Sequence, residues 1–225
     1  MKLAVVLLSG GLDSCVTAAL AMEAGYDIAL LHINYGQRTQ GKELAAFTAI
    51  ADYYGIKKRL VVDISYFRDI GGSSLTDYSI NIEEGEGGRE QLFPSTYVPF
   101  RNGNMVSIAV SWAEVIGAER VYIGVVEGDG GYPDCTESFY EKFNALLSVG
   151  LPAGKTVFIE TPLINLKKSE IVCLGSRLGV PFELTWSCYQ SESVACGVCS
   201  SCKLRLKAFC DIGEKDPICY RGDDL

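Results

Sequence analysis

Residues 3–14 read Leu-Ala-Val-Val-Leu-Leu-Ser-Gly-Gly-Leu-Asp-Ser. The first six are continuously apolar, as is typical of a short strand that is buried on both faces of a parallel sheet. Two adjacent glycines then let the chain turn tightly and let a ligand approach the backbone N–H groups. A helical pattern follows at once, so the positive end of the helix dipole and the unpaired first-turn donors face the turn. The stretch therefore predicts a strand, an anion-binding turn and a helix, in that order.

The turn differs from two common nucleotide-binding motifs. No Gly-Lys-Ser/Thr follows it, as in a Walker A loop, and the Gly-x-Gly-x-x-Gly spacing is absent. It resembles instead the PP-loop of the ATP pyrophosphatases, which cleave ATP between the α and β phosphates. That resemblance implies an ATP site formed by Leu8, Ser9, Gly10, Gly11, Leu12, Asp13 and Ser14. A plain turn, with Asp13 or Ser14 as a helix N-cap, is the alternative.

Composition limits the class of protein and its partners. A chain of 225 residues is long enough for one α/β domain with a small appendage. The net charge of −8 disfavours binding to nucleic-acid phosphates, and small-molecule chemistry is the better expectation. No run approaches the ~18 to 20 apolar residues of a membrane span, and the first residues do not resemble a signal peptide. We therefore expect a cytoplasmic protein whose nine cysteines stay reduced, with no nucleic-acid or membrane partner.

Apolar segments of strand length alternate with segments of helical period along most of the chain. This alternation predicts a doubly wound parallel sheet of about five strands. The expected strands are 3–8, 27–33, 60–64, 120–124 and 157–161, and the expected helices are 12–24, 39–54, 104–117, 137–148 and 168–178. Residues 71–91 interrupt the alternation as a loop, either a lid or a solvated insertion. We divide the chain into an ATP-binding domain, residues 1–180, and a metal-binding segment, residues 181–225.

Six of the nine cysteines lie at or beyond position 188. Cys196, Cys199 and Cys202 have the spacing Cys-x-x-Cys-x-x-Cys, and Cys188 precedes them. Four thiolates with no open position predict a structural zinc site that holds a helix at about 199–211 against the main domain. A redox-active Cys-x-x-Cys and an iron–sulfur cluster are the alternatives.

Two further polar segments follow expected strands or precede expected helices. Residues 129–135 read Asp-Gly-Gly-Tyr-Pro-Asp-Cys and follow the strand 120–124; in open α/β sheets, ligands bind at loops in that position. The turn 95–104 contains Arg101, which can clamp a carboxylate or a phosphate through two parallel hydrogen bonds. A surface cation with no ligand is the alternative for Arg101.

Several motifs together carry a more specific resemblance. They are Ser9–Ser14, Asn34–Arg38, Val98–Asn102, Tyr132–Cys135, Thr185–Tyr189 and the Cys196–Cys202 triplet. In this order the chain resembles the 7-cyano-7-deazaguanine synthases, the precursor-forming enzymes of queuosine and archaeosine, over nearly its whole length. It departs from that family at residues 125–129 and at Thr136, where an arginine is typical.

The resemblance implies an ATP-dependent carbon–nitrogen ligase. It would convert 7-carboxy-7-deazaguanine and ammonia to the nitrile through an adenylated acid and an amide, with Mg²⁺ bridging the phosphates and a homodimer as the assembly. The implied catalytic residues are Asp13, Ser14 and Lys168, and the implied substrate contacts are Arg101, Asp129, Tyr132 and Asp134. The zinc ligands would be Cys188, Cys196, Cys199 and Cys202. A solvated helix start is the alternative for Lys168, and a hydrogen-bonded strand residue is the preferred interpretation of His32, the single histidine.

Three rival functions stay open on the residues alone. One is a PP-loop tRNA-thiolating enzyme with an iron–sulfur cluster, which the acidic composition disfavours. Another is a zinc-knuckle binding module with a non-catalytic loop. The third is a ligase that forms an amide from a different acid.

Overall fold

The computed structural model describes residues 2–82, 93–128 and 131–222. Its centre is a parallel sheet with the strand order β3-β2-β1-β4-β5. The strands are β1 (Leu3–Leu7), β2 (Asp27–Asn34), β3 (Arg59–Asp63), β4 (Arg120–Ile123) and β5 (Phe158–Glu160). The chain winds outward from β1 in one direction and then in the other, which confirms the predicted doubly wound sheet. The reversal between β1 and β4 is the place where open α/β sheets bind their ligands.

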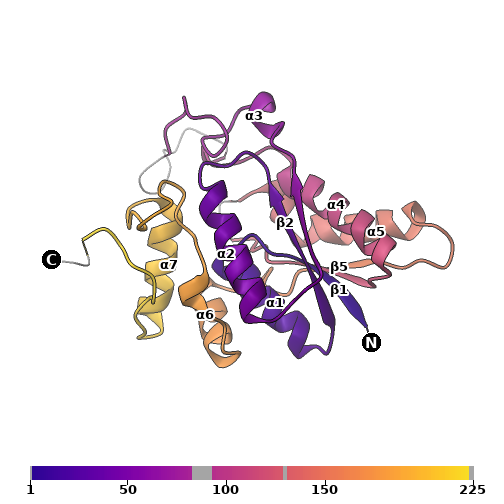
Figure 1. Ribbon diagram of the computed structural model, residues 1–225. Helices are drawn as coiled ribbons and strands as arrows, with labels where there is room; N and C mark the ends of the chain where they lie inside the picture. Colours follow the sequence, from indigo (N-terminus) through magenta and orange to yellow (C-terminus); the bar gives the residue numbers. More distant parts are fainter. Residues whose placement is uncertain (1, 83–92, 129–130, 223–225) are drawn as a thin grey trace.

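Helices cover both faces of the sheet (Figure 1). One face carries α1 (Leu12–Glu23), α2 (Gln40–Tyr53), α6 (Lys168–Arg177) and α7 (Ser200–Asp211). The other carries α4 (Arg101–Ile116) and α5 (Glu137–Gly150). The short helix α3 (Phe67–Ile70) follows β3, and two 3-10 turns, η1 (Pro133–Cys135) and η2 (Phe182–Leu184), lie in loops. None of the helices in the described part of the chain has both the length and the apolar character needed to cross a bilayer.

Successive residues of β1 enter different cores, because side chains alternate across a strand. Val5 and Leu7 pack toward α4 and α5, whereas Val6, and Leu8 directly after the strand, pack toward α1, α2, α6 and α7. Both sets are buried. This explains why the strand reads as an uninterrupted apolar run instead of an alternating one.

The start of α4 lies three residues before the expected one, at Arg101 instead of residue 104. Phe100 has a left-handed backbone, with φ of 53°, and this turns the chain into the helix. The Asp134 carboxylate then accepts a hydrogen bond from the Asn102 N–H at 2.8 Å and so caps the first turn. Such a cap comes from a distant loop, so the local pattern of residues 95–104 could not indicate it.

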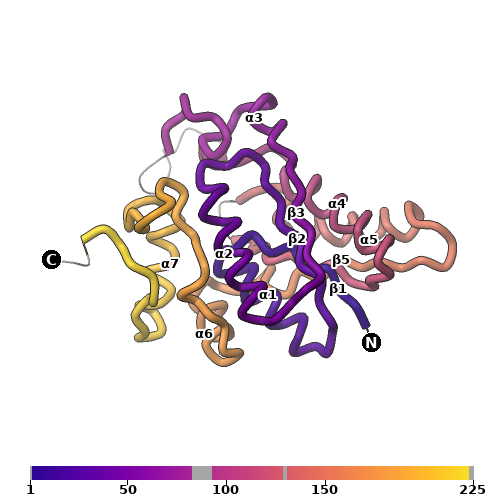
Figure 2. Tube along the Cα trace, viewed as in Figure 1, coloured from indigo at the N-terminus to yellow at the C-terminus, as the bar shows by residue number. Residues whose placement is uncertain are grey.

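The C-terminal segment shares its packing with the main domain. Val180, Phe182, Ala208 and Phe209 belong to the same buried cluster as β1 and α1. The chain from orange to yellow in Figure 2 lies beside α2, and Ala46 of α2 packs with the cysteine-rich part of it. The boundary at residue 180 stays a prediction, since no break in the core marks it. Of the predicted loop 71–91, residues 83–91 lie outside the described residues. The structure therefore does not test whether this loop is a lid.

Candidate active site

The turn between β1 and α1 is compact and held by its own hydroxyl groups. Ser9 Oγ and Ser14 Oγ are 3.1 Å apart, Gly11 N–H donates to Ser9 Oγ at 3.1 Å, and Ser14 Oγ donates to the Gly11 carbonyl at 2.9 Å. Gly10 has φ of 92°, and a Cβ there would lie 2.6 Å from the Glu43 carbonyl oxygen. Only glycine lets the turn pack this closely on α2.

Asp13 and Lys168 form an ion pair beside this turn. Lys168, the first residue of α6, places Nζ 2.7 Å from Asp13 Oδ2 in the first turn of α1. Their side chains are 15% and 27% exposed. Asp13 Oδ1 is buried and has no hydrogen-bond partner among the described residues. A buried carboxylate oxygen without a donor is well suited to a metal ion or to a ligand donor.

A cavity of about 270 Å³ joins the turn to the rest of the candidate site. It opens at the carboxyl ends of β1, β2 and β4, at the point where the strand order reverses. Its described lining includes Ser9, Asp13, Ser14, Tyr35, Glu43, Arg101, Tyr132, Trp186 and Tyr189. A larger cavity, about 780 Å³, lies between α5 and β5 and touches none of these residues. We therefore take the smaller cavity as the candidate active site, because the side chains expected to bind phosphate and substrate line it and not the larger one.

Arg101 faces the cavity from the first turn of α4. Its Nη1 donates to Tyr35 Oη at 3.1 Å, and its guanidinium carbon lies 5.0 Å from the centroid of the Tyr35 ring. Burial raises the pKa of Tyr35 to about 12, so Tyr35 stays a neutral phenol at physiological pH. Arg101 Nε is buried without a partner among the described residues. The guanidinium thus retains an N–H that can donate to a bound anion.

The other expected substrate contacts are divided between the cavity and the structure beneath it. Tyr132 lines the cavity, with its hydroxyl 2.8 Å from Thr96 Oγ1 and its ring stacked on Tyr97 at 5.4 Å between centroids. Asp134 is 3% exposed, does not line the cavity, and uses its carboxylate to cap α4. Asp129 lies outside the described residues.

Thr136, one of the departures from the family pattern, has a structural task. Its hydroxyl accepts a hydrogen bond from the Phe139 N–H at 3.2 Å and caps the N-terminus of α5. In the other departing stretch, Val125 and Val126 line the cavity, and Glu127 accepts from the Glu137 N–H at 3.1 Å.

His32 has no free ring nitrogen in this fold. Nδ1 lies 3.0 Å from the Leu8 carbonyl oxygen and Nε2 lies 3.1 Å from Asn34 Oδ1. The side chain is fully buried, and burial lowers its pKa. The structure agrees with the interpretation of His32 as a hydrogen-bonded strand residue.

Several residues that line the cavity are not among the contacts expected from the sequence, and three of them, Glu43, Trp186 and Tyr189, bear on its chemistry. Trp186 and Tyr189 come from the C-terminal segment, and the Trp186 N–H donates to the Gly10 carbonyl at 2.8 Å, which ties that segment to the turn. Glu43 comes from the first turn of α2. The motif Thr185–Tyr189 was a signal for the first two, whereas a glutamate near a helix start is too common to indicate a site.

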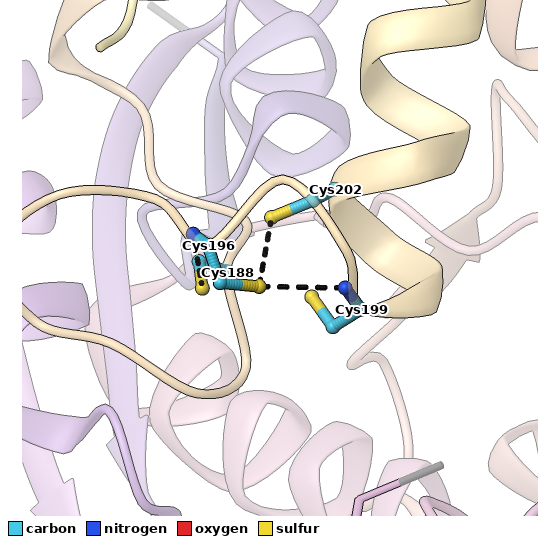
Figure 3. Close-up of side chains that lie close together, drawn as sticks. All are labelled: Cys188, Cys196, Cys199 and Cys202. Carbon is cyan, nitrogen blue, oxygen red and sulfur yellow. Dashed lines mark hydrogen bonds between the residues drawn. The ribbon is translucent and has the colours of Figure 1, made fainter. Parts of the chain in front are cut away.

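Four buried cysteines converge at the start of α7 (Figure 3). The Sγ atoms of Cys188, Cys196, Cys199 and Cys202 all lie within 4.8 Å of one another. Cys196 Sγ and Cys202 Sγ are 3.9 Å apart, near the ~3.8 Å that a tetrahedron of ~2.3 Å zinc–sulfur bonds requires. Backbone N–H groups point at the sulfur atoms, as where Cys199 N lies 3.3 Å from Cys196 Sγ. The group has the geometry to hold a metal ion such as zinc.

The sheet order, the Ser-Gly-Gly turn after β1 and the cavity at the reversal point define a nucleotide-binding α/β protein of the PP-loop class. In fold it is similar to the predicted subunit of tRNA methyltransferase from Methanocaldococcus jannaschii, at a TM-score of 0.51 and 16% identity over 96% of this chain and 90% of that one. A family model, queuosine biosynthesis protein QueC, matches residues 3–213. The chain belongs to this family.

Curated relatives agree with the family model. The protein of Chlorobium phaeobacteroides strain DSM 266 is 56% identical over 96% of both chains, and that of Campylobacter curvus is 50% identical over 98% of both. Both are named 7-cyano-7-deazaguanine synthase, which confirms the resemblance inferred from the motifs. A U34-tRNA thiolase from Methanococcus maripaludis has 16% identity and a TM-score of 0.48, which is too remote to support the thiolation alternative.

Proposed function

We propose that the protein is an ATP-dependent ligase that converts 7-carboxy-7-deazaguanine and ammonia to 7-cyano-7-deazaguanine. Full-length relatives at 50–56% identity bear the name of that synthase. The single structural observation that carries the proposal is the cavity shared by the Ser9–Ser14 turn and Arg101. A site that activates an acid with ATP needs an anchor for phosphate and an anchor for carboxylate within reach of each other.

The first step is adenylation of the acid. A carboxylate oxygen attacks the α phosphorus of ATP and forms an acyl adenylate, while the bond between the α phosphorus and the bridging oxygen breaks and pyrophosphate departs. The N–H groups around Gly10 and Gly11, the hydroxyl groups of Ser9 and Ser14, and the dipole of α1 hold the departing phosphates. Lys168 neutralises charge beside them and keeps Asp13 in place.

Asp13 is the residue suited to hold Mg²⁺. Its Oδ1 is buried without a partner, and a carboxylate oxygen is a preferred magnesium ligand. When bound with ATP, the ion would neutralise charge on the phosphates.

Ammonia then attacks the acyl carbon, a proton is lost, and AMP leaves to give the amide. The amide oxygen then attacks the α phosphorus of a second ATP, pyrophosphate departs and one N–H proton is lost. Loss of AMP with the remaining N–H proton forms the nitrile. Arg101 orients the carboxylate and the polar intermediates, and Tyr132 stacks on the heterocycle. Asp134 acts indirectly in this scheme, because it positions the first turn of α4 from which Arg101 extends.

The four cysteines hold a structural zinc ion in this proposal. Four thiolates leave no open coordination position for catalysis. The site orders the chain around Trp186 and Tyr189, which line the cavity. We further propose that the enzyme acts in the cytoplasm as a homodimer, on small molecules and not on nucleic acid or membranes.

Mass spectrometry of the products tests the function directly. With ATP, Mg²⁺, ammonium and 7-carboxy-7-deazaguanine, we expect the nitrile, AMP and pyrophosphate. Pyrophosphate release with another acid only would indicate a different ligase, and none with any acid would indicate a binding module. Visible absorbance of the purified protein distinguishes an iron–sulfur cluster from zinc.

Replacement of Asp13 tests the phosphate assignment. Asp13→Ala should reduce kcat by about 100-fold or more, because charge stabilisation at the departing phosphates is lost. The zinc content of the cysteine site and the melting temperature should stay near wild type. Asp52→Ala, which removes an exposed carboxylate on α2, is the control. A near wild-type rate for Asp13→Ala would contradict the assignment.

A further inference from the structure

We propose that Glu43 determines specificity by accepting hydrogen bonds from the amino-amide edge of the substrate heterocycle. This edge is the ring N–H together with the neighbouring exocyclic amino group, a guanidine-like pair of donors. The inference rests on the proposed function, because it assigns a recognition residue for that substrate. It moves this task from Asp134, which the sequence favoured, to α2.

Two carboxylates line the described cavity, Asp13 and Glu43. Asp13 is paired with Lys168 at the phosphate end. Asp134 is buried under α4 and is not part of the described lining. Among the described residues, Glu43 is therefore the acidic acceptor that the cavity offers away from the phosphates.

Neighbouring side chains hold the Glu43 carboxylate in one orientation. Thr39 Oγ1 donates to Oε1 at 2.7 Å, and Gln37 Nε2 donates to Oε2 at 2.9 Å. The Gln37 amide cannot turn over, because its Oε1 accepts the Tyr35 N–H at 2.9 Å, and a backbone N–H can only donate. Thr39 and Gln37 therefore both donate to the Glu43 carboxylate, which accepts through each of its oxygens.

The carboxylate keeps capacity for a ligand. Each ionised oxygen has two lone pairs, and each of these two oxygens uses one for the contact just described. Two remaining lone pairs on one planar group match two parallel donors on one edge of a heterocycle, as in bidentate recognition of guanidinium groups. Gln37 is 2% exposed, so water does not compete for this supporting contact.

The rest of the lining completes a site for a planar acid. Tyr35, Tyr132 and Tyr189 supply aromatic surface in the same cavity. Arg101 offers an unpartnered N–H to a carboxylate. A ligand with an acidic group and an amino-amide edge can thus engage a cation and an anion that both face one cavity.

Binding of matched ligands tests the proposal. The dissociation constants of 7-carboxy-7-deazaguanine and of an analogue without the exocyclic amino group are measured by calorimetry for the wild type and for Glu43→Gln. We expect Glu43→Gln to weaken binding of the full acid by roughly 10- to 100-fold. It should change binding of the analogue much less and leave the affinity for ATP unchanged.

Two control variants isolate the position. Glu192→Gln makes the same acid-to-amide change at a carboxylate that accepts from the Gly41 and Lys42 N–H groups at the start of α2, outside the described lining. Asp134→Asn tests the residue that the sequence favoured. Both variants keep Glu43, so both should retain the wild-type preference for the full acid over the analogue.

The inference would be overturned if Glu43→Gln weakened the binding of both ligands equally, or if the preference for the full acid were lost in Asp134→Asn and kept in Glu43→Gln. Turnover is measured separately with wild-type protein. If the wild type forms the nitrile but Glu43→Gln weakens the binding of both ligands equally, the role of Glu43 is refuted and the proposed reaction stands. If Glu43→Gln selectively weakens the binding of the full acid but the wild type forms no nitrile, the proposed reaction is refuted and the role of Glu43 stands.

Discussion

Gly10 is the residue at which the turn between β1 and α1 touches α2. Its left-handed backbone and the 2.6 Å approach to the Glu43 carbonyl both require the absence of a side chain. Gly25 has a similar φ, 83°, but a Cβ there would meet no atom within 4 Å. The two glycines therefore share one backbone requirement and differ in packing.

We predict that Gly10→Ala destabilises the protein by about 2 to 5 kcal/mol, since left-handed strain and overpacking add. Gly25→Ala should cost about 1 to 2 kcal/mol, from the backbone strain alone. Urea unfolding of both variants gives the comparison. Equal losses would show that the close approach to α2 has no energetic consequence.

Burial of Glu43 has a consequence for pH dependence. Desolvation raises the pKa of Glu43, while Thr39, Gln37 and Arg101 oppose the rise and Glu192 adds to it. Recognition of two donors needs the ionised carboxylate. As the pH falls through this raised pKa, affinity for the full acid should fall relative to the analogue without the amino group. Calorimetry between about pH 5 and pH 8 measures it.

The same shift affects stability with a defined sign. A carboxyl group whose pKa is higher in the folded than in the unfolded state contributes stability at low pH, and this contribution is lost as the pH rises through the folded-state pKa. The free energy of unfolding of Glu43→Gln, relative to that of the wild type, should therefore be higher near pH 8 than near pH 5. The opposite trend would show that Glu43 is ionised at low cost and acts structurally.

Among the secondary-structure elements, helix α7 is joined to the segment that precedes Cys188 by one buried side chain, that of Arg205. Arg205 and Asp216 are each 2% exposed and form two contacts, at 2.7 and 2.9 Å. Arg205 also donates to Thr185 Oγ1 at 2.6 Å. Thr185 directly precedes Trp186, so this network positions a cavity residue from outside the cavity.

Loss of one partner of this pair leaves a buried charge unpaired. Asp216→Ala should reduce the free energy of unfolding by about 3 to 5 kcal/mol. The control is Asp211→Ala on α7, which removes an exposed i, i+4 pair with Lys207 and should leave the unfolding midpoint unchanged. Similar midpoints for both variants would contradict the role of the network.

Across the whole molecule, the cysteine-rich segment and the turn between β1 and α1 are in direct contact. Trp186 donates from its backbone to Gly10, lines the cavity, and packs in the same buried cluster as Cys188 and Cys199. The conformation of the chain around the cysteines therefore helps to fix the position of Trp186 in the cavity. A metal held by these cysteines would therefore influence the shape of the cavity.

Loss of the metal should therefore affect stability and binding together. Cys199→Ser should lower the metal-to-protein ratio, reduce the melting temperature by roughly 5 to 15 °C and raise the KM for the acid. Elemental analysis, thermal unfolding and steady-state kinetics measure the three effects. Cys210→Ser, at an exposed position on α7, is the control. An unchanged metal ratio in Cys199→Ser would refute the assignment of this ligand.

Local patterns were sufficient for most of the fold and for the grouping of the four cysteines. Helix and strand periodicity indicated all five strands, and ligand spacing indicated the four cysteines that the structure brings within 4.8 Å. The elements that were missed, α3 and the two 3-10 turns, are three or four residues long. A single turn is too short to show a period.

The sequence by itself determined the strand–turn–helix at residues 3–23, the succession of strands and helices along the chain and the group of four cysteines, because each depends on residues that are close together in the chain. Only the tertiary structure decided that Lys168 meets Asp13 across 155 positions, that Asp134 caps a helix, and that Glu43 and Trp186 face the cavity. Those contacts are set by how helices pack on the two faces of the sheet. Local periodicity does not contain that information.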